Sequence, residues 1–208
     1  MKQDHGFSLV PLDCPSCGAA IEAEGTDVVY YCSGCRNGYR YDQGKPGLVP
    51  VEVSFVSRPD RAVDVYKPFW LLPAEVKILH RLAKGQGLSG MLKHFFEGED
   101  AVHGSGTVTF AVPAFRVDIE RATEMSRHYT EALPGIGERL GERLVGGCFD
   151  VDDAKKLVHY GVVATEVHRS DLLTELRYEI QFGTPRLLGV PFINDGGLSK
   201  DAFFHLVV

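Results

Sequence analysis

Two short motifs, Cys14-Pro15-Ser16-Cys17 and Cys32-Ser33-Gly34-Cys35, set the organisation of this 208-residue chain. Each motif leaves two residues between its cysteines, a spacing that lets a tight turn direct both sulfur atoms the same way. Gly18, directly after the first motif, supplies the unusual backbone angles that such a turn needs. Residues 18–31 between the motifs are enough for a short hairpin. The spacing therefore predicts four thiolates converging on one metal ion.

The segment CPSCG followed by YYCSGC resembles a zinc ribbon, and the resemblance covers residues 12–42. It implies one structural Zn²⁺ in a tetrahedral site whose ligands are Cys14, Cys17, Cys32 and Cys35. The protein would occupy all four positions, which leaves none for water or substrate. A unit of about thirty residues buries too little apolar surface to fold alone, whereas structural zinc contributes on the order of 10–16 kcal/mol. The rest of the chain shows no motif of comparable specificity.

Three other interpretations of these cysteines stay open. Disulfides require an oxidising compartment, but the N-terminal MKQDHGFSL has no apolar run typical of a signal peptide, so we expect reduced thiols and a cytoplasmic location. A rubredoxin-type iron site uses the same four thiolates, although that family places its pairs much further apart. Redox CxxC chemistry needs one pair at a helix N-terminus, which two pairs in a hairpin context fit poorly.

Composition is that of an ordinary globular protein, with 44% hydrophobic and 24% charged residues and a net charge of −6. The chain contains no run of eighteen apolar residues, so the sequence predicts no membrane-spanning helix. Many zinc ribbons bind nucleic acid through Lys and Arg, but residues 1–50 contain four basic side chains against six acidic ones. We therefore expect a protein partner rather than a nucleic acid. Composition does not indicate the oligomeric state.

The segment Gln43-Gly44-Lys45-Pro46-Gly47 predicts a boundary between a zinc-ribbon module, residues 1–45, and a larger domain, residues 46–208. The larger domain shows strand-like alternation first, helical periodicity in mid-chain, and alternation again. Helices are expected from Asp118 to Leu133 and from Asp152 to about Tyr160. This order predicts an α+β fold with a mostly antiparallel sheet and two main helices.

Strands are expected around residues 51–55, 63–65, 107–112, 178–182, 187–192 and 203–208, and a turn at Gly183-Thr184-Pro185 joins residues 178–182 and 187–192 as a hairpin. Three of the expected strands run into a proline and an aromatic residue: Pro68-Phe69, Pro113-Ala114-Phe115 and Pro191-Phe192. These positions indicate either a quasi-repeated sheet or simply prolines that end strands.

Phe69 and Trp70 lie in the densest apolar run of the chain. Because neighbouring side chains of a strand face opposite ways, one of the two rings points away from the core unless a second layer covers it. The pair is therefore a candidate partner-binding surface, with burial inside this chain as the alternative.

No catalytic set is evident in the sequence. Carboxylates and a histidine that would hold a second metal cluster at Glu97, Glu99, Asp100 and His103, although this stretch also fits a solvated turn. A second group, which would serve acid–base chemistry, comprises His159, Glu166, His168 and Asp171. Cys148, the fifth cysteine, is interpreted as a buried free thiol.

The sequence thus favours a non-enzymatic zinc-ribbon protein that acts as a protein-binding adaptor or assembly component. The alternative is an enzyme whose active site lies in the α+β domain and whose zinc is structural. A nucleic-acid-binding protein is the third possibility.

Overall fold

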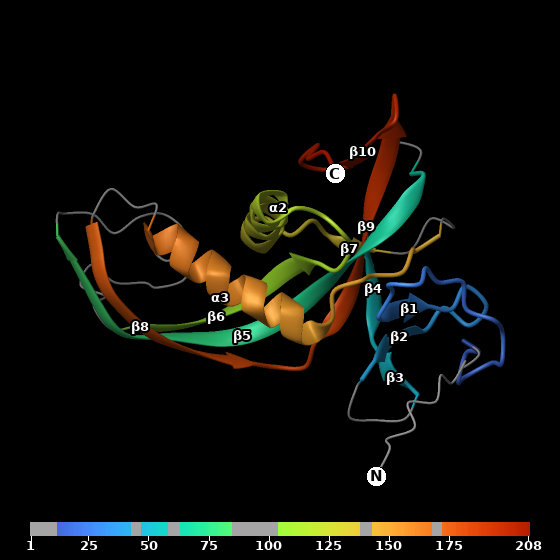
Figure 1. The fold of residues 1–208 in the computed structure, drawn as a ribbon, viewed down its shortest axis with the longest axis horizontal. Helices are drawn as coiled ribbons and strands as arrows, with labels where there is room; N and C mark the ends of the chain where they lie inside the picture. The colour runs from blue at the N-terminus through green and yellow to red at the C-terminus, as the bar shows by residue number, and fades with distance from the viewer. Residues whose placement is uncertain (1–11, 43–46, 58–62, 85–103, 138–142, 168–171) are drawn as a thin grey trace, which may run out of the picture.

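The computed structural model describes residues 12–42, 47–57, 63–84, 104–137, 143–167 and 172–208. These ranges form an α+β fold with a three-stranded sheet, a seven-stranded sheet and two helices (Figure 1). Only one strand pair among them, β4 with β9, is parallel. The predicted fold class is confirmed. Neither helix in these ranges combines the length and apolar character that a bilayer-spanning helix needs.

The small sheet contains the N-terminal cysteine region. Its antiparallel order is β1-β2-β3, with bounds Val29–Tyr31, Gly38–Tyr41 and Leu48–Val51. It therefore includes residues beyond position 45, where the sequence predicted a domain boundary. Only Glu52 separates β3 from β4, which belongs to the large sheet, so the single strand expected across residues 51–55 is divided between the two sheets.

The large sheet is built on β5, a strand of 20 residues that spans about 65 Å at 3.3 Å per residue. Along its length β5 pairs first with β9, then with β6, and finally with β8. The strand bounds are β4 Val53–Val56, β5 Val65–Lys84, β6 Gly104–Pro113, β7 Ile136–Gly137, β8 Leu172–Phe182, β9 Arg186–Asp195 and β10 Leu198–Asp201. Figure 1 shows β5, β6 and β8 forming a long curved arm beneath α3.

The hairpin predicted between residues 178–182 and 187–192 is wrong. The two strands exist, as parts of β8 and β9, but both pair with β5, at successive segments of that strand. The long β5 offers more ladder positions than one neighbour can fill. Each strand therefore pairs with β5 rather than folding back on the other.

Helices α2 (Ile119–Glu131) and α3 (Val151–Val167) cover different parts of the large sheet. Asp118 caps α2 by accepting the N–H of Arg121 at 2.9 Å, and Asp150 caps α3 by accepting the N–H groups of Asp152 and Asp153 at 2.8 Å each. Helix α3 continues to Val167, beyond the end expected near Tyr160. Its buried side chains recur at helical spacing: Val151, Ala154, Val158 and Val162.

Phe69 and Trp70 are both fully buried, each with 0% exposure. They therefore do not form the exposed partner-binding surface that the sequence suggested, and the alternative of burial within this chain holds. Trp70 packs in the cluster beneath α3, and its indole N–H donates to the Phe149 carbonyl at 2.9 Å. Phe69 faces the opposite cluster, against Tyr129 of α2 at 5.0 Å between ring centroids. The second layer that the alternation required comes from this chain's own helices.

The three proline–aromatic segments meet at one place in the sheet. Phe69 lies opposite Pro113, and the ring of Phe115 packs at 5.7 Å from Phe69 and at 5.6 Å from Phe192. Pro113 ends β6, but Pro68 and Pro191 lie inside β5 and β9. Prolines inside these strands still use their carbonyl groups, because Pro68 accepts the N–H of Ala114 at 2.9 Å.

Candidate metal centre

Two backbone turns of the same kind hold the cysteines. In the first, the N–H of Gly18 donates to the Cys14 carbonyl at 2.8 Å; in the second, the N–H of Arg36 donates to the Cys32 carbonyl at 2.7 Å. The residue after each motif adopts a left-handed backbone, with φ 71° at Gly18 and 63° at Arg36. A non-glycine residue is uncommon in that conformation. The two motifs therefore form matched turns whose sulfur atoms face each other.

The four sulfur atoms of Cys14, Cys17, Cys32 and Cys35 lie within 4.8 Å of one another. Cys14 and Cys35 are 3.5 Å apart, and Cys17 and Cys32 are 3.6 Å apart. A tetrahedral ion with metal–sulfur distances of about 2.3 Å places its sulfurs about 3.8 Å apart. The sulfurs are too far apart for the disulfide bond length of about 2.05 Å. The cluster is thus positioned to bind one metal ion with all four ligands supplied by protein.

Tyr39 supports the cluster from β2. Its side chain is fully buried, and its hydroxyl oxygen lies 3.2 Å from the Cys14 sulfur and 2.7 Å from the Ser16 hydroxyl. The surrounding apolar core is small and includes Ile21 and Tyr30. Groups in contact with metal ligands orient the ligands and tune their basicity. Sequence reasoning missed Tyr39, although its place four residues after Cys35 at the start of β2 aligns it with the site.

The thiol environments differ across the cluster. Burial raises the pKa of Cys14, but hydrogen bonds with Tyr39 and with the backbone amides of Ser16 and Cys17 outweigh burial and lower it to about 6. At Cys17 the backbone amide of Ala19 lowers the pKa, yet the neighbouring thiols of Cys14 and Cys32 raise it to about 12. Without a cation, the Cys17 thiol therefore stays protonated at neutral pH. Metal binding must release this proton.

The other predicted site residues fall largely outside the described ranges. Glu97, Glu99, Asp100, His103, His168 and Asp171 lie outside the described residues. Of the second group, His159 is exposed on α3, with its Nδ1 atom 3.1 Å from the Tyr178 hydroxyl. Cys148 lies apart from the four-cysteine cluster, and no other group of three or more potential metal ligands comes together within the described ranges.

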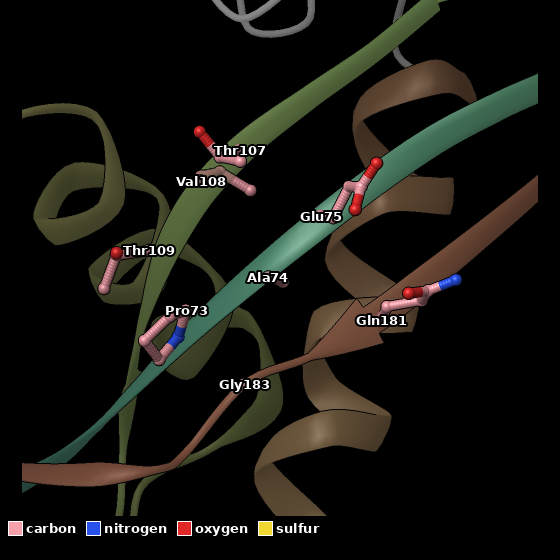
Figure 2. A pocket seen from close by; sticks show the side chains of 8 residues that line it. All are labelled: Pro73, Ala74, Glu75, Thr107, Val108, Thr109, Gln181 and Gly183. Atoms are coloured by element: carbon pink, nitrogen blue, oxygen red, sulfur yellow. The ribbon is translucent and has the colours of Figure 1, made fainter.

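A shallow groove of about 340 Å³ lies on the part of the large sheet formed by β5, β6 and β8. Its polar side chains come from three strands: Thr107 and Thr109 from β6, Glu75 from β5 and Gln181 from β8. Figure 2 shows Thr109 and Gln181 on opposite sides of β5. Glu75 is the single charged side chain among its lining residues, so the groove has no paired charges or group of metal ligands.

Comparison of the chain with protein-family models, curated proteins and solved structures found no match. The geometry of the described residues is therefore the basis of the functional argument.

Proposed function

We propose that this protein is a non-enzymatic, zinc-stabilised adaptor whose α+β part binds another protein. Zinc is favoured because four thiolates in a closed tetrahedral arrangement form its typical structural site. Such a site offers no open position for catalysis. The metal's role in this proposal is to stabilise the small N-terminal sheet, and the binding surface lies elsewhere.

The observation that carries the binding role is an apolar cleft of about 440 Å³ between α2 and α3. Its walls include Val117, Leu157 and Phe149, and its rim carries Ile119 and Tyr160. These two rim side chains are 53% and 51% exposed. Large apolar side chains exposed together around an apolar cleft are typical of a protein-binding site.

Charge around the cleft indicates the kind of partner. In residues 118–124 and 150–156, which begin the two helices that form the cleft, acidic side chains outnumber basic ones six to three. Lys155 and Lys156 pair with Asp152 and Asp153 at 3.0 Å, and the two helix starts together keep a net negative charge. We therefore propose an amphipathic helix whose apolar residues enter the cleft and whose flanking Lys or Arg residues face these acids.

The test places a photocrosslinking amino acid at Ile119 in the full chain, in its native host. The matched control places it at Leu198, which is 51% exposed on β10. We expect Ile119, and not Leu198, to crosslink one protein, through a segment with apolar and basic residues. In a purified pair, Ile119→Ser should weaken binding about tenfold and Leu198→Ser should not. Equal crosslinking at both positions, no crosslinking, or crosslinking to a second copy of this chain would contradict the proposal.

A further inference from the structure

A second cavity, of about 550 Å³, lies where the small sheet meets the large one. One wall is the turn at residues 24–27, and the other is formed by Lys67 of β5, by Phe115-Arg116 after β6 and by residues 143–148. The carbonyl of Gly147 accepts the N–H groups of Val28 and Val29 at 2.7 and 2.9 Å. The N–H of Tyr66 donates to the Arg143 carbonyl at 2.8 Å, so backbone hydrogen bonds hold these walls together.

Lys67 presents a cation to this cavity. Its ammonium group lies 5.1 Å from the centre of the Phe115 ring and 4.8 Å from that of Phe192. Burial lowers the pKa of Lys67 because the charged form loses water. Within the described part of the chain, no ion pair engages this side chain. The two rings offset some of the lost hydration, and none of the residues that the structure describes offers the ammonium a hydrogen-bond acceptor.

Arg116, beside Phe115, adds a second cation to the same wall. Its guanidinium interacts with the Cys148 thiol, and burial raises the pKa of that thiol, so the sulfur stays protonated and does not neutralise the arginine. No ion pair to Arg116 occurs among the residues that the structure describes. A half-buried ammonium and a guanidinium thus face one cavity without a described carboxylate partner.

Two carboxylates, those of Glu24 and Asp27, line the opposite side of this cavity. The Asp27 carboxylate accepts the N–H of Glu24 at 2.7 Å and lies in the field of Arg143. Arg143 in turn pairs with Glu22 at 3.1 Å. A Cβ atom at Gly146 would collide with the Asp27 carboxylate, so this carboxylate packs directly against the 143–148 segment. Asp27 therefore interacts with the 143–148 segment, and Lys67 and Arg116 are left without a carboxylate partner among the described residues.

We propose that this cavity binds a small oxyanion, a carboxylate or a phosphate, between Lys67 and Arg116. An oxyanion would accept hydrogen bonds from both cations in a site partly shielded from water, where such bonds are strong. The site differs from the four-cysteine cluster and from the cleft between α2 and α3. Its occupancy does not depend on the protein partner proposed above.

The experiment titrates the metal-loaded full chain with inorganic phosphate and, separately, with succinate, by calorimetry at constant ionic strength. Saturable binding of one equivalent of either anion is expected, and the anion that binds identifies the class. Lys67→Met and Arg116→Gln should each weaken binding about tenfold or more. Lys77→Met, an exposed lysine on the same strand, is the matched control and should bind as the wild type does.

Arg116→Gln decides the matter if Lys67→Met fails to fold, since Arg116 is exposed and its replacement leaves the core intact. Absence of saturable binding of both anions would overturn the proposal. Binding that Arg116→Gln leaves unchanged would overturn it as well. Ile119→Ser, on the separate α2–α3 cleft, should leave anion binding intact, so failure of one proposal is distinguishable from failure of the other.

Discussion

At the scale of single residues, Gly18 and Arg36 occupy equivalent left-handed positions in the two cysteine turns. A Cβ atom at Gly18 would meet nothing within 4 Å, so only the backbone conformation opposes a side chain there. Gly18→Ala should therefore destabilise the metal-bound small sheet by about 1–2 kcal/mol. Competition with a metal-binding dye measures this as a loss of metal affinity.

Arg36→Gly is the matched control for that change. It removes the conformational cost of a non-glycine residue but makes the unfolded chain more flexible, and the two effects are of similar size. We expect metal affinity within about twofold of the wild type. Equal losses for Gly18→Ala and Arg36→Gly would show that side-chain contacts, rather than the left-handed backbone, decide the stability of these turns.

The sequence predicted the four cysteines because their spacing is local and the thiolate chemistry needs it. It missed Tyr39, although this residue lies only four positions after Cys35, and it did not predict Lys67 or Arg116, since nothing in the local pattern marks these two residues. Each becomes part of a site only when strands distant in sequence are brought together. Phe69 and Trp70 illustrate the same dependence on distant segments. Strand alternation correctly predicted that the two rings lie on opposite faces of the sheet, but it did not predict that helices cover both faces.

At the scale of elements, a buried carboxylate fixes the end of the chain after β10. Asp201 is fully buried, and its Oδ1 atom accepts the Tyr129 hydroxyl at 2.7 Å and the N–H groups of Phe203 and Phe204. Its Oδ2 atom accepts the N–H of Leu206 at 2.6 Å. This one side chain therefore ties α2 to the C-terminal turn. Strand β10 ends at Asp201, before residues 203–208, where the sequence predicted a last strand.

Asp201→Asn should destabilise the protein by about 2–3 kcal/mol. The amide turns one acceptor into a donor facing a backbone N–H, and the charge that strengthened the other bonds is lost. Urea unfolding followed by the fluorescence of Trp70, the one tryptophan in the chain, measures the change. Tyr129→Phe removes a single bond to Asp201 and should cost less than Asp201→Asn. A variant Asp201→Asn as stable as the wild type would contradict the role given to this carboxylate.

Helices α2 and α3 were the elements best predicted from sequence, because capping residues and helical spacing are features of one continuous segment. The strands with which β8 and β9 pair were not predicted. This pairing depends on the length of β5 and on which strands compete to form hydrogen bonds with it. Sequence reasoning therefore recovered the fold class and the metal ligands, while strand order and the two cavities required the structure.

At the scale of the whole molecule, the two sheets differ in how much hydrophobic core stabilises them. The large sheet has two extensive clusters of buried side chains, whereas the small sheet has one small cluster that includes Cys14 and Cys32. Backbone hydrogen bonds between Val29 and Gly147 and the contact of Tyr31 with Phe55 at 5.9 Å join the sheets. Loss of the metal should therefore unfold the small sheet and loosen only the adjoining edge of the large one.

Removal of the metal with a chelator at neutral pH tests this dependence. Elemental analysis should find about one zinc per chain before treatment. After treatment, hydrogen exchange should show lost amide protection across residues 28–41, while the paired segments of β5, β6 and β9 stay protected. Cys17→Ser should reproduce the loss without a chelator, because its exposed side chain contributes little packing and its effect comes through the metal. Cys148→Ser, at a cysteine outside the cluster, should keep both the metal and the protection. Iron in place of zinc would correct the identity of the ion, and full protection of the small sheet after complete metal removal would show that its own core suffices to fold it.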